Sequence, residues 1–261
     1  MKIEVLLATM FYENESKDFL DLMNIQTDLI IGNQTDYNEN RLLDYKNNTI
    51  KILSRNERGV GKNRNTCLFY SDADILLFAD NDVCYYDGYA EKIKEYYEKN
   101  PKADIVIFNF KEKRGEEALH DINTKTKKAR LRDIVKFGTW AVSARRESIL
   151  KARISFSLLF GGGAKYSCGE DTLFLTDCYK KGLKIYLSNI TLGEVIHKES
   201  TWYTGLNEKY ILDKGALFKA MSPRNYKFLI YYHAFKHRQL YSGFGSIREV
   251  VKIMIRGAKN Y

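Results

Sequence analysis

The 261-residue sequence has few of the residues that mark disulfide-rich, zinc-binding or membrane-spanning proteins. It contains two prolines and four cysteines, and because no two cysteines form a Cys-x-x-Cys pair, neither a disulfide framework nor a zinc site is expected. No apolar run reaches the roughly 18 residues that a membrane-spanning helix needs, and Glu4 interrupts the apolar run at the N-terminus. Since 44% of the residues are hydrophobic, the chain can bury one sizeable core. These properties predict a folded cytosolic protein with buried free thiols.

Positive charge is in excess and unevenly distributed. The net charge is +9, and residues 208–261 carry eleven Lys or Arg against three acidic residues. Such a segment attracts phospholipid head groups, nucleic acid and phosphorylated substrates alike, so charge alone does not choose among them. Its end has Ser246 and Glu249 at capping-box spacing, which predicts a basic amphipathic helix that either lies in an anionic membrane interface or packs onto the domain. Residues 111–136, charged and poor in large apolar groups, are expected to form a surface loop.

Short apolar runs recur along the first hundred residues, separated by stretches with helical character. Continuous runs of this length are typical of strands that are buried on both faces. They predict an α/β fold in which helices cover both faces of a mostly parallel sheet, with ligands bound at the carboxyl ends of the strands. The runs are residues 2–9, 27–32, 49–53, 74–79 and 103–110.

One of these runs ends in Asp80-Asn81-Asp82. Because an unpaired carboxylate is costly to bury, two carboxylates beside a buried strand indicate a bound cation. Carboxylate oxygens are hard ligands, which favours Mg²⁺ or Mn²⁺. The alternative is an ordinary turn in which Asp and Asn bond their own backbone.

A basic, glycine-containing segment precedes this strand at residues 55–70. It is not a phosphate-binding P-loop, because Asn56 and Asn63 stand where that motif needs Gly and Ser or Thr. Lys62 and Arg64 at a helix start can still contact an anion or a nucleotide, or they can form a solvated basic turn.

Glu170 and Asp171 follow a glycine-rich stretch, residues 161–169. Glycines let the backbone approach a ligand closely, so this pattern predicts a carboxylate displayed at a helix N-terminus as a general base. The alternative is simple charge complementarity at the helix end. Further on, His197 closes an apparent strand, where it is either structural or, as a neutral imidazole, part of a divalent metal site.

These motifs together resemble family 2 glycosyltransferases of the GT-A fold, particularly bacterial enzymes that build capsule, exopolysaccharide or lipopolysaccharide. The resemblance rests on Arg64-Asn65, on the Asp-Asn-Asp strand end and on the block at residues 161–185. It covers residues 1–205. The remaining residues, 206–261, are therefore expected to form a basic, aromatic helical extension.

The resemblance implies a nucleotide-sugar donor, commonly a UDP-sugar, and a saccharide hydroxyl as acceptor. It implies that Asp171, or Glu170 in its place, removes the acceptor's proton and that the anomeric configuration inverts. Mn²⁺ or Mg²⁺ would be held by Asp80, Asp82 and His197. The first two strands lack the family's usual end residues, and Asp36 can replace the missing acid. The residues expected to contact the donor are Thr9, Asn33, Asp36, Lys62, Arg64, Asp80 and Asn81.

The hypothesis is an enzyme of cell-surface polysaccharide synthesis that works in the cytoplasm, peripherally on the inner face of the cell membrane. Its acceptor would be a growing or lipid-linked saccharide, the membrane surface would meet the C-terminal extension, and no nucleic acid is expected. The alternative is a non-catalytic basic module that binds membrane or nucleic acid through that extension.

Overall fold

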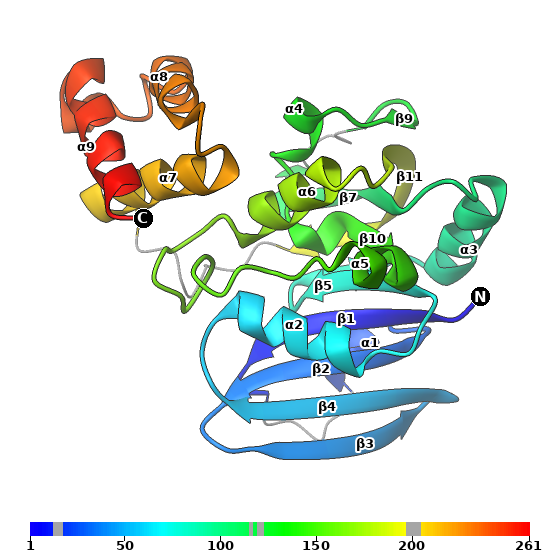
Figure 1. Cartoon of the computed structure of the whole chain (residues 1–261). Helices are drawn as coiled ribbons and strands as arrows, with labels where there is room; N and C mark the ends of the chain where they lie inside the picture. Colours follow the sequence, from blue (N-terminus) through cyan, green and yellow to red (C-terminus); the bar gives the residue numbers. More distant parts are fainter. Residues whose placement is uncertain (13–17, 115–116, 119–122, 197–204) are drawn as a thin grey trace.

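A computed structural model describes residues 1–12, 18–114, 117–118, 123–196 and 205–261 (Figure 1). A mixed sheet crosses the molecule with the strand order β3-β4-β2-β1-β5-β10-β7-β11-β6, while β8 pairs with β7 and β9 with β11. The strands are β1 (Ile3–Met10), β2 (Asp28–Thr35), β3 (Glu39–Tyr45), β4 (Asn48–Asn56), β5 (Ile75–Asp80), β6 (Val83–Tyr85), β7 (Ile105–Arg114), β8 (Glu117–Ala118), β9 (Lys127–Lys128), β10 (Val142–Arg145) and β11 (Ile185–Ile196).

The neighbouring strands β4, β2, β1 and β5 run parallel, so their carboxyl ends meet at one edge of the sheet. The five apolar runs correspond to β1, β2, β4, β5 and β7, which confirms the α/β fold. The expectation of helical character between β2 and β4 is wrong, since β3 fills that place as an antiparallel partner of β4. Six of its seven residues are not buried, so this edge strand has no continuous apolar run.

Helices cover both faces of the sheet. Tyr97 of α3 shares a hydrogen bond of 3.0 Å with Ser143, which pairs with Leu77 of β5. The next residue, Phe78, points to the opposite face and contacts Phe174 of α6 at 5.6 Å between ring centroids. The helices before residue 205 are α1 (Asp18–Leu22), α2 (Val60–Tyr70), α3 (Tyr89–Lys99), α4 (Leu131–Ile134), α5 (Arg146–Ala152) and α6 (Glu170–Lys180), with a 3₁₀ turn, η1 (Thr139–Ala141).

The C-terminal residues form α7 (Glu208–Met221), α8 (Tyr226–Lys236), the 3₁₀ turn η2 (Ser242–Phe244) and α9 (Ile247–Lys259). Helix α9 starts with the expected capping box of Ser246 and Glu249. It packs directly on α7 through glycines: a Cβ atom on Gly215 would lie 1.8 Å from the Met254 carbonyl oxygen, and one on Gly257 1.9 Å from that of Leu212. The apolar face of α9 is therefore buried against the protein. This agrees with the expectation that the helix packs onto the domain, and not with the expectation that it lies in a membrane interface.

Helix α7 also packs toward the sheet domain, where Leu217 and Ala216 share an apolar cluster with Phe160 and Leu173. The division of the chain at residue 205 stays a prediction. In the described part of the chain, no helix combines the length and the apolar character that crossing a bilayer requires.

Candidate active site

A cavity of about 660 Å³, here called the acidic cavity, opens at the carboxyl ends of β1 and β5. Four carboxylates from two parts of the chain line it: Asp80 ends β5, Asp82 follows this strand, and Glu170 and Asp171 begin α6. The parallel pairing of Ala8 with Asp80 brings the end of β1, with Thr9, to the same edge. The site is thus assembled from separate loops, as the sequence predicts.

Arg64 of α2 joins the two pairs of acids. Its side chain is buried, with an exposed fraction of 5%, and lies over the ring of Phe156. One guanidinium nitrogen donates to Asp80 Oδ1 at 2.7 Å and the other to Glu170 Oε1 at 2.9 Å. Burial alone would lower the pKa of Arg64, but Asp80 and Glu170 outweigh it and leave that pKa raised. The Arg64 guanidinium is therefore a fixed positive charge that holds β5 and α6 together.

Asp171 differs from Glu170 in its surroundings. Its Oδ1 accepts a hydrogen bond of 2.6 Å from the backbone N–H of Thr172, and Arg64 makes no hydrogen bond to it among the described contacts. Burial, and then the negative charge of Glu170, raise the pKa of Asp171 to about 6, against the opposing effects of Thr172, Arg64 and Lys214. Glu170 is held by an ion pair, whereas Asp171 is the carboxyl group whose pKa lies near neutral pH.

The glycines before α6 are required by close contacts. Gly161 has a φ of +105°, and a Cβ atom there would lie 2.8 Å from the Glu170 carboxyl carbon and 2.6 Å from Val60 Cγ1. Gly169, with a φ of +110°, would meet Leu217 of α7 at 2.7 Å. Glycine therefore lets this loop pass beside the carboxylate and beneath α7 at the same time.

Helix α7 completes the cavity. Asp213 Oδ2 accepts hydrogen bonds of 2.8 Å from both the backbone N–H and the hydroxyl of Ser167, which ties the loop before α6 to this helix. The next residue, Lys214, lines the cavity. Burial lowers the pKa of Lys214, but Cys168, Tyr210 and Asp171 outweigh it, so that the pKa is raised and the ammonium stays charged. Sequence reasoning missed Lys214, because it lies more than forty positions from the acids it faces.

Some predicted donor contacts lie elsewhere. Asn33 is buried, and its amide is used by Tyr12 and Ser54, with bonds of 2.8 to 3.1 Å. Lys62 forms an ion pair with Glu57, at 2.7 Å, outside the cavity lining.

Asp36 is exposed and also lies outside that lining, whereas Thr9, Asn81 and Gln34 are part of it. Gln34 accepts a bond of 2.7 Å from the N–H of Gly59, the N-cap of α2. His197 lies outside the described residues.

The residues present fit a divalent cation only in part. Within the described residues no group of three or more His, Cys, Asp or Glu side chains could hold a metal ion, and Asp80 is ion-paired with Arg64. Asp80 and Asp82 nevertheless line one cavity, and Mg²⁺ is commonly held by one or two carboxylates that substrate phosphates and water complete. The donor set thus suits a cation that arrives with a diphosphate.

Replacing Arg64 by Met should destabilise the protein by about 2 to 3 kcal/mol at pH 7.5, because Asp80 and Glu170 would lose their shared partner. The effect should be below that of a fully buried pair, since Asp80 keeps 33% of its side-chain exposure. Urea unfolding measures the loss of stability. Lys151→Met, which breaks an exposed pair with Glu147, is the control and should change stability by less than about 0.5 kcal/mol. Equal effects of the two variants would contradict the role of Arg64.

Comparisons with known proteins bear on the family and the fold of this chain. The model of the family "Glycosyl transferase family 2" matches residues 23–153. Among solved structures, S. aureus TarS 1–349 in complex with UDP is 15% identical, with a TM-score of 0.65 over 98% of this chain and 81% of that chain.

The complex of TarS 1–349 with UDP-GlcNAc is 16% identical, with a TM-score of 0.62 over 84% of this chain and 66% of that one. A further TarS structure is 14% identical, with a TM-score of 0.63 over 97% of this chain and 55% of the other, so this protein spans about half of its length. At such identities the likeness shows the GT-A fold alone, and no curated protein matches the sequence. Because the family model matches half of the chain, the protein belongs to glycosyl transferase family 2.

Proposed function

We propose that this glycosyltransferase moves a sugar from a UDP-sugar to a hydroxyl group of a saccharide acceptor, with a divalent metal ion and with inversion at the anomeric carbon. One observation carries the proposal: Arg64 holds Asp80 and Glu170, so that, of the two acids that begin α6, Asp171 remains available for proton transfer in the acidic cavity. A pKa of about 6 suits a general base that works near neutral pH.

The donor would lie at the β1 and β5 ends of the acidic cavity. Thr9, Gln34 and Asn81 offer hydrogen-bonding groups there, and the buried Arg64 supplies positive charge beneath them. Solved structures of TarS, which shares the fold, contain UDP or UDP-GlcNAc, and this supports a UDP-sugar for this chain.

Asp82 would be the main protein ligand of Mn²⁺ or Mg²⁺, with Asp80 beside it and His197 as a further candidate. A bound divalent cation would offset the negative charge that develops on the departing diphosphate. The carboxylates also keep the diphosphate from binding well without such a cation, because like charges would face each other across the cavity.

Asp171 would act on the acceptor. Its carboxylate takes the proton of the acceptor hydroxyl while that oxygen forms a bond to the anomeric carbon of the donor sugar. The bond from the anomeric carbon to the diphosphate oxygen breaks, and UDP leaves with the electron pair. Attack from the face opposite the diphosphate inverts the configuration. Lys214, charged and close to Asp171, would keep the base in its ionised form.

For its place in the cell we propose synthesis of a cell-surface polysaccharide at the inner face of the membrane. Membrane contact would fall to α8, because the apolar face of α9 is buried. Phe228, Tyr231, Tyr232 and Phe235 lie on one face of α8 and expose 57 to 71% of their surface. Aromatic side chains of this kind suit a membrane–water interface. The non-catalytic alternative is set aside, because the chain belongs to a family of enzymes.

UDP with Mn²⁺ should raise the melting temperature of the protein by about 5 to 10 °C at a hundredfold excess over its dissociation constant. UDP with EDTA should give a much smaller shift, because the carboxylates would then repel the diphosphate. In Asp82→Ala, the Mn²⁺-dependent part of the melting-temperature shift should be lost. If no nucleoside diphosphate or sugar nucleotide shifts the melting temperature, the proposal is wrong.

Asp171→Asn should slow the release of UDP from the donor by about 10² to 10⁴-fold, because an amide cannot accept the proton. The measurement needs no acceptor, since water can replace it in a slow hydrolysis. In the wild type the rate should fall as the pH drops through about 6, where Asp171 becomes protonated. Asp177→Asn, on the same helix but outside the cavity lining, is the matched control and should keep the wild-type rate. A wild-type rate in Asp171→Asn would rule it out as the base.

A further inference from the structure

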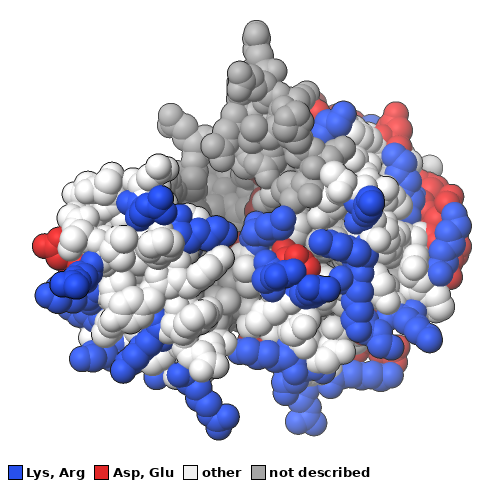
Figure 2. All heavy atoms as spheres, turned by 90° about the horizontal axis from the view of Figure 1, so that it is seen from above, with Lys and Arg blue, Asp and Glu red and all other residues white. Residues whose placement is uncertain are grey.

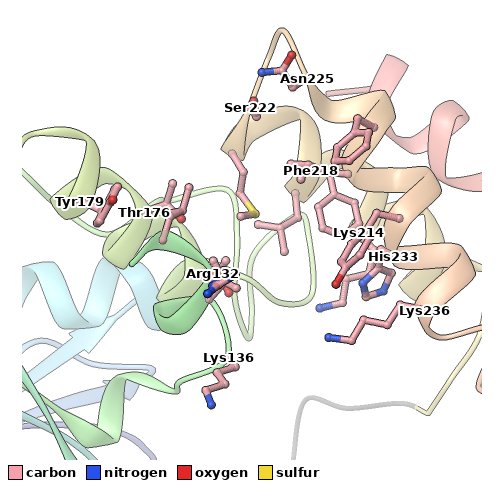
Figure 3. Close-up of a pocket in the computed structure, with 18 of the residues that line it drawn as sticks. Arg132, Lys136, Thr176, Tyr179, Lys214, Phe218, Ser222, Asn225, His233 and Lys236 are labelled. Carbon is pink, nitrogen blue, oxygen red and sulfur yellow. The ribbon is translucent and has the colours of Figure 1, made fainter. Parts of the chain in front are cut away.

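A second cavity adjoins the acidic cavity on the side of the C-terminal helices. It has a volume of about 1050 Å³ and lies between α4 and α6 on one side and α7 and α8 on the other. Figure 3 shows Arg132 and Lys136 on one wall, and Lys214 and Lys236 on the facing wall. We call it the basic cavity.

The basic cavity has one sign of charge. Among the described residues of its lining there is no Asp or Glu, and no carboxylate in the described part of the chain forms an ion pair with its cations. Figure 2 shows Lys and Arg side chains on both sides of the hollow that divides this face, with acidic atoms among them on one side. Like charges around a hollow repel each other, and a bound anion relieves that repulsion. The cations are Arg130, Arg132, Lys136, Lys214 and Lys236.

The positive charge around the basic cavity also affects the pKa values of two histidines in its lining. Burial, His237 and the nearby lysines lower the pKa of His233 to about 3, and burial with Lys236 and Lys214 lowers that of His237. Both rings are therefore neutral at pH 7, and His233 shares a hydrogen bond of 2.9 Å with the hydroxyl of Tyr241. The charge of the cavity comes from its lysines and arginines.

The two cavities lie next to each other, because Val135, Lys136, Thr172 and Lys214 line both. Thr172 is the residue after Asp171, and Lys214 interacts electrostatically with Asp171. A group bound among the cations therefore lies beside the proposed base, on the side away from the β-strand ends where the donor is placed.

Apolar and aromatic side chains form another part of the lining, beside polar residues such as Ser222 and Asn225. Phe218, Leu217 and Met221 come from α7, and Phe228 and Tyr232 from α8. Phe228 and Tyr232 expose 71% and 58% of their surface. Such side chains can contact a sugar ring or a hydrocarbon chain attached to an anionic group.

We propose that the basic cavity binds a phosphate group of the acceptor, so that the acceptor is a phosphate-bearing saccharide. This inference rests on the proposed function, which supplies the role of Asp171. The phosphate is held by lysine and arginine, and the hydroxyl that receives the sugar reaches Asp171 through the lining that the two cavities share. A diphosphate linked to a lipid and a phosphate on a soluble sugar present the same chemistry to these cations.

The test is binding of three probes by titration calorimetry, each with UDP and Mn²⁺ present so that the donor side is filled. Farnesyl diphosphate represents a lipid-linked diphosphate, glucose 6-phosphate a soluble sugar phosphate, and farnesol the lipid without charge. Farnesyl diphosphate or glucose 6-phosphate should bind, and the probe that binds more tightly identifies the source of the phosphate. Binding should weaken as salt rises, because the contact is between charges. If neither phosphate binds, or if farnesol binds as tightly as farnesyl diphosphate, the proposal is overturned.

The double variant Arg132→Glu/Lys236→Glu locates the site. Both side chains are exposed and line the basic cavity but not the acidic cavity, so UDP binding should be unchanged. Phosphate binding should weaken on the order of 10- to 100-fold. Lys227→Glu/Arg238→Glu, which changes the charge equally at exposed positions outside the lining, should leave both kinds of binding unchanged.

Equal losses of phosphate binding in the two double variants would place the phosphate elsewhere and overturn the proposal. If charge reversal disturbs the fold, the neutral double variant Arg132→Gln/Lys236→Gln repeats the test. It should show a smaller loss of phosphate binding. A separate titration with UDP alone distinguishes a failure of the proposed function from a failure of this inference. Failure to bind UDP contradicts the proposed function, whereas UDP binding without phosphate binding contradicts only this inference.

Discussion

The ion pairs of Arg64 are the interaction on which the site depends. A single buried guanidinium connects Asp80 at the end of β5 with Glu170 at the start of α6, and Arg64 and Glu170 lie 106 positions apart in the sequence. Burying such a charge is costly unless it is paired and hydrogen-bonded, and here Asp80 and Glu170 supply both. The same pairing decides which acid remains for chemistry, because it engages Glu170, whereas burial and the negative charge of Glu170 raise the pKa of the neighbouring Asp171.

The C-terminal helices belong to this arrangement. Asp213 holds the loop before α6 through Ser167, Leu217 covers Gly169, and Lys214 enters the acidic cavity. Helix α7 is in turn fixed by α9, through contacts that only glycine allows. The excess positive charge of residues 208–261 is thus partly directed into the protein, where it lines the basic cavity beside Asp171. The two cavities divide the site into an acidic part that suits a cation and a diphosphate, and a basic part that suits an anionic ligand.

The sequence predicts those features that depend on local pattern. Buried strands are visible as apolar runs. Asp80 and Asp82 are found because they end or follow a strand, and Glu170 and Asp171 because they begin a helix after glycines. The edge strand β3 was missed because its residues are largely exposed. Asn33 and Lys62 were assigned to the donor from their positions in the chain, but the bonds of their side chains depend on neighbours that the sequence does not reveal.

The basic cavity is the clearest case of a feature that sequence reasoning could not find. Residues 111–136 were interpreted as a surface loop, yet Arg130, Arg132 and Lys136 lie on one wall of this cavity. Their partners, Lys214 and Lys236, come from helices about a hundred positions away along the chain. Only the packing of α7 and α8 near α4 and α6 brings these charges around one hollow, and that packing depends on non-local contacts.

The central claim is that Asp171 is the carboxyl group set apart by the pairing of Arg64 with Glu170. The most direct measurement follows the side-chain carboxyl ¹³C resonances of Asp and Glu by NMR from pH 4 to pH 8, in the wild type, Asp171→Asn and Glu170→Gln. The account predicts a carboxyl resonance that titrates near pH 6 and disappears in Asp171→Asn. In Glu170→Gln this titration should move to lower pH, because a negative neighbour is removed. A resonance near pH 6 that disappears in Glu170→Gln instead, or no carboxyl that titrates above pH 5, would contradict it.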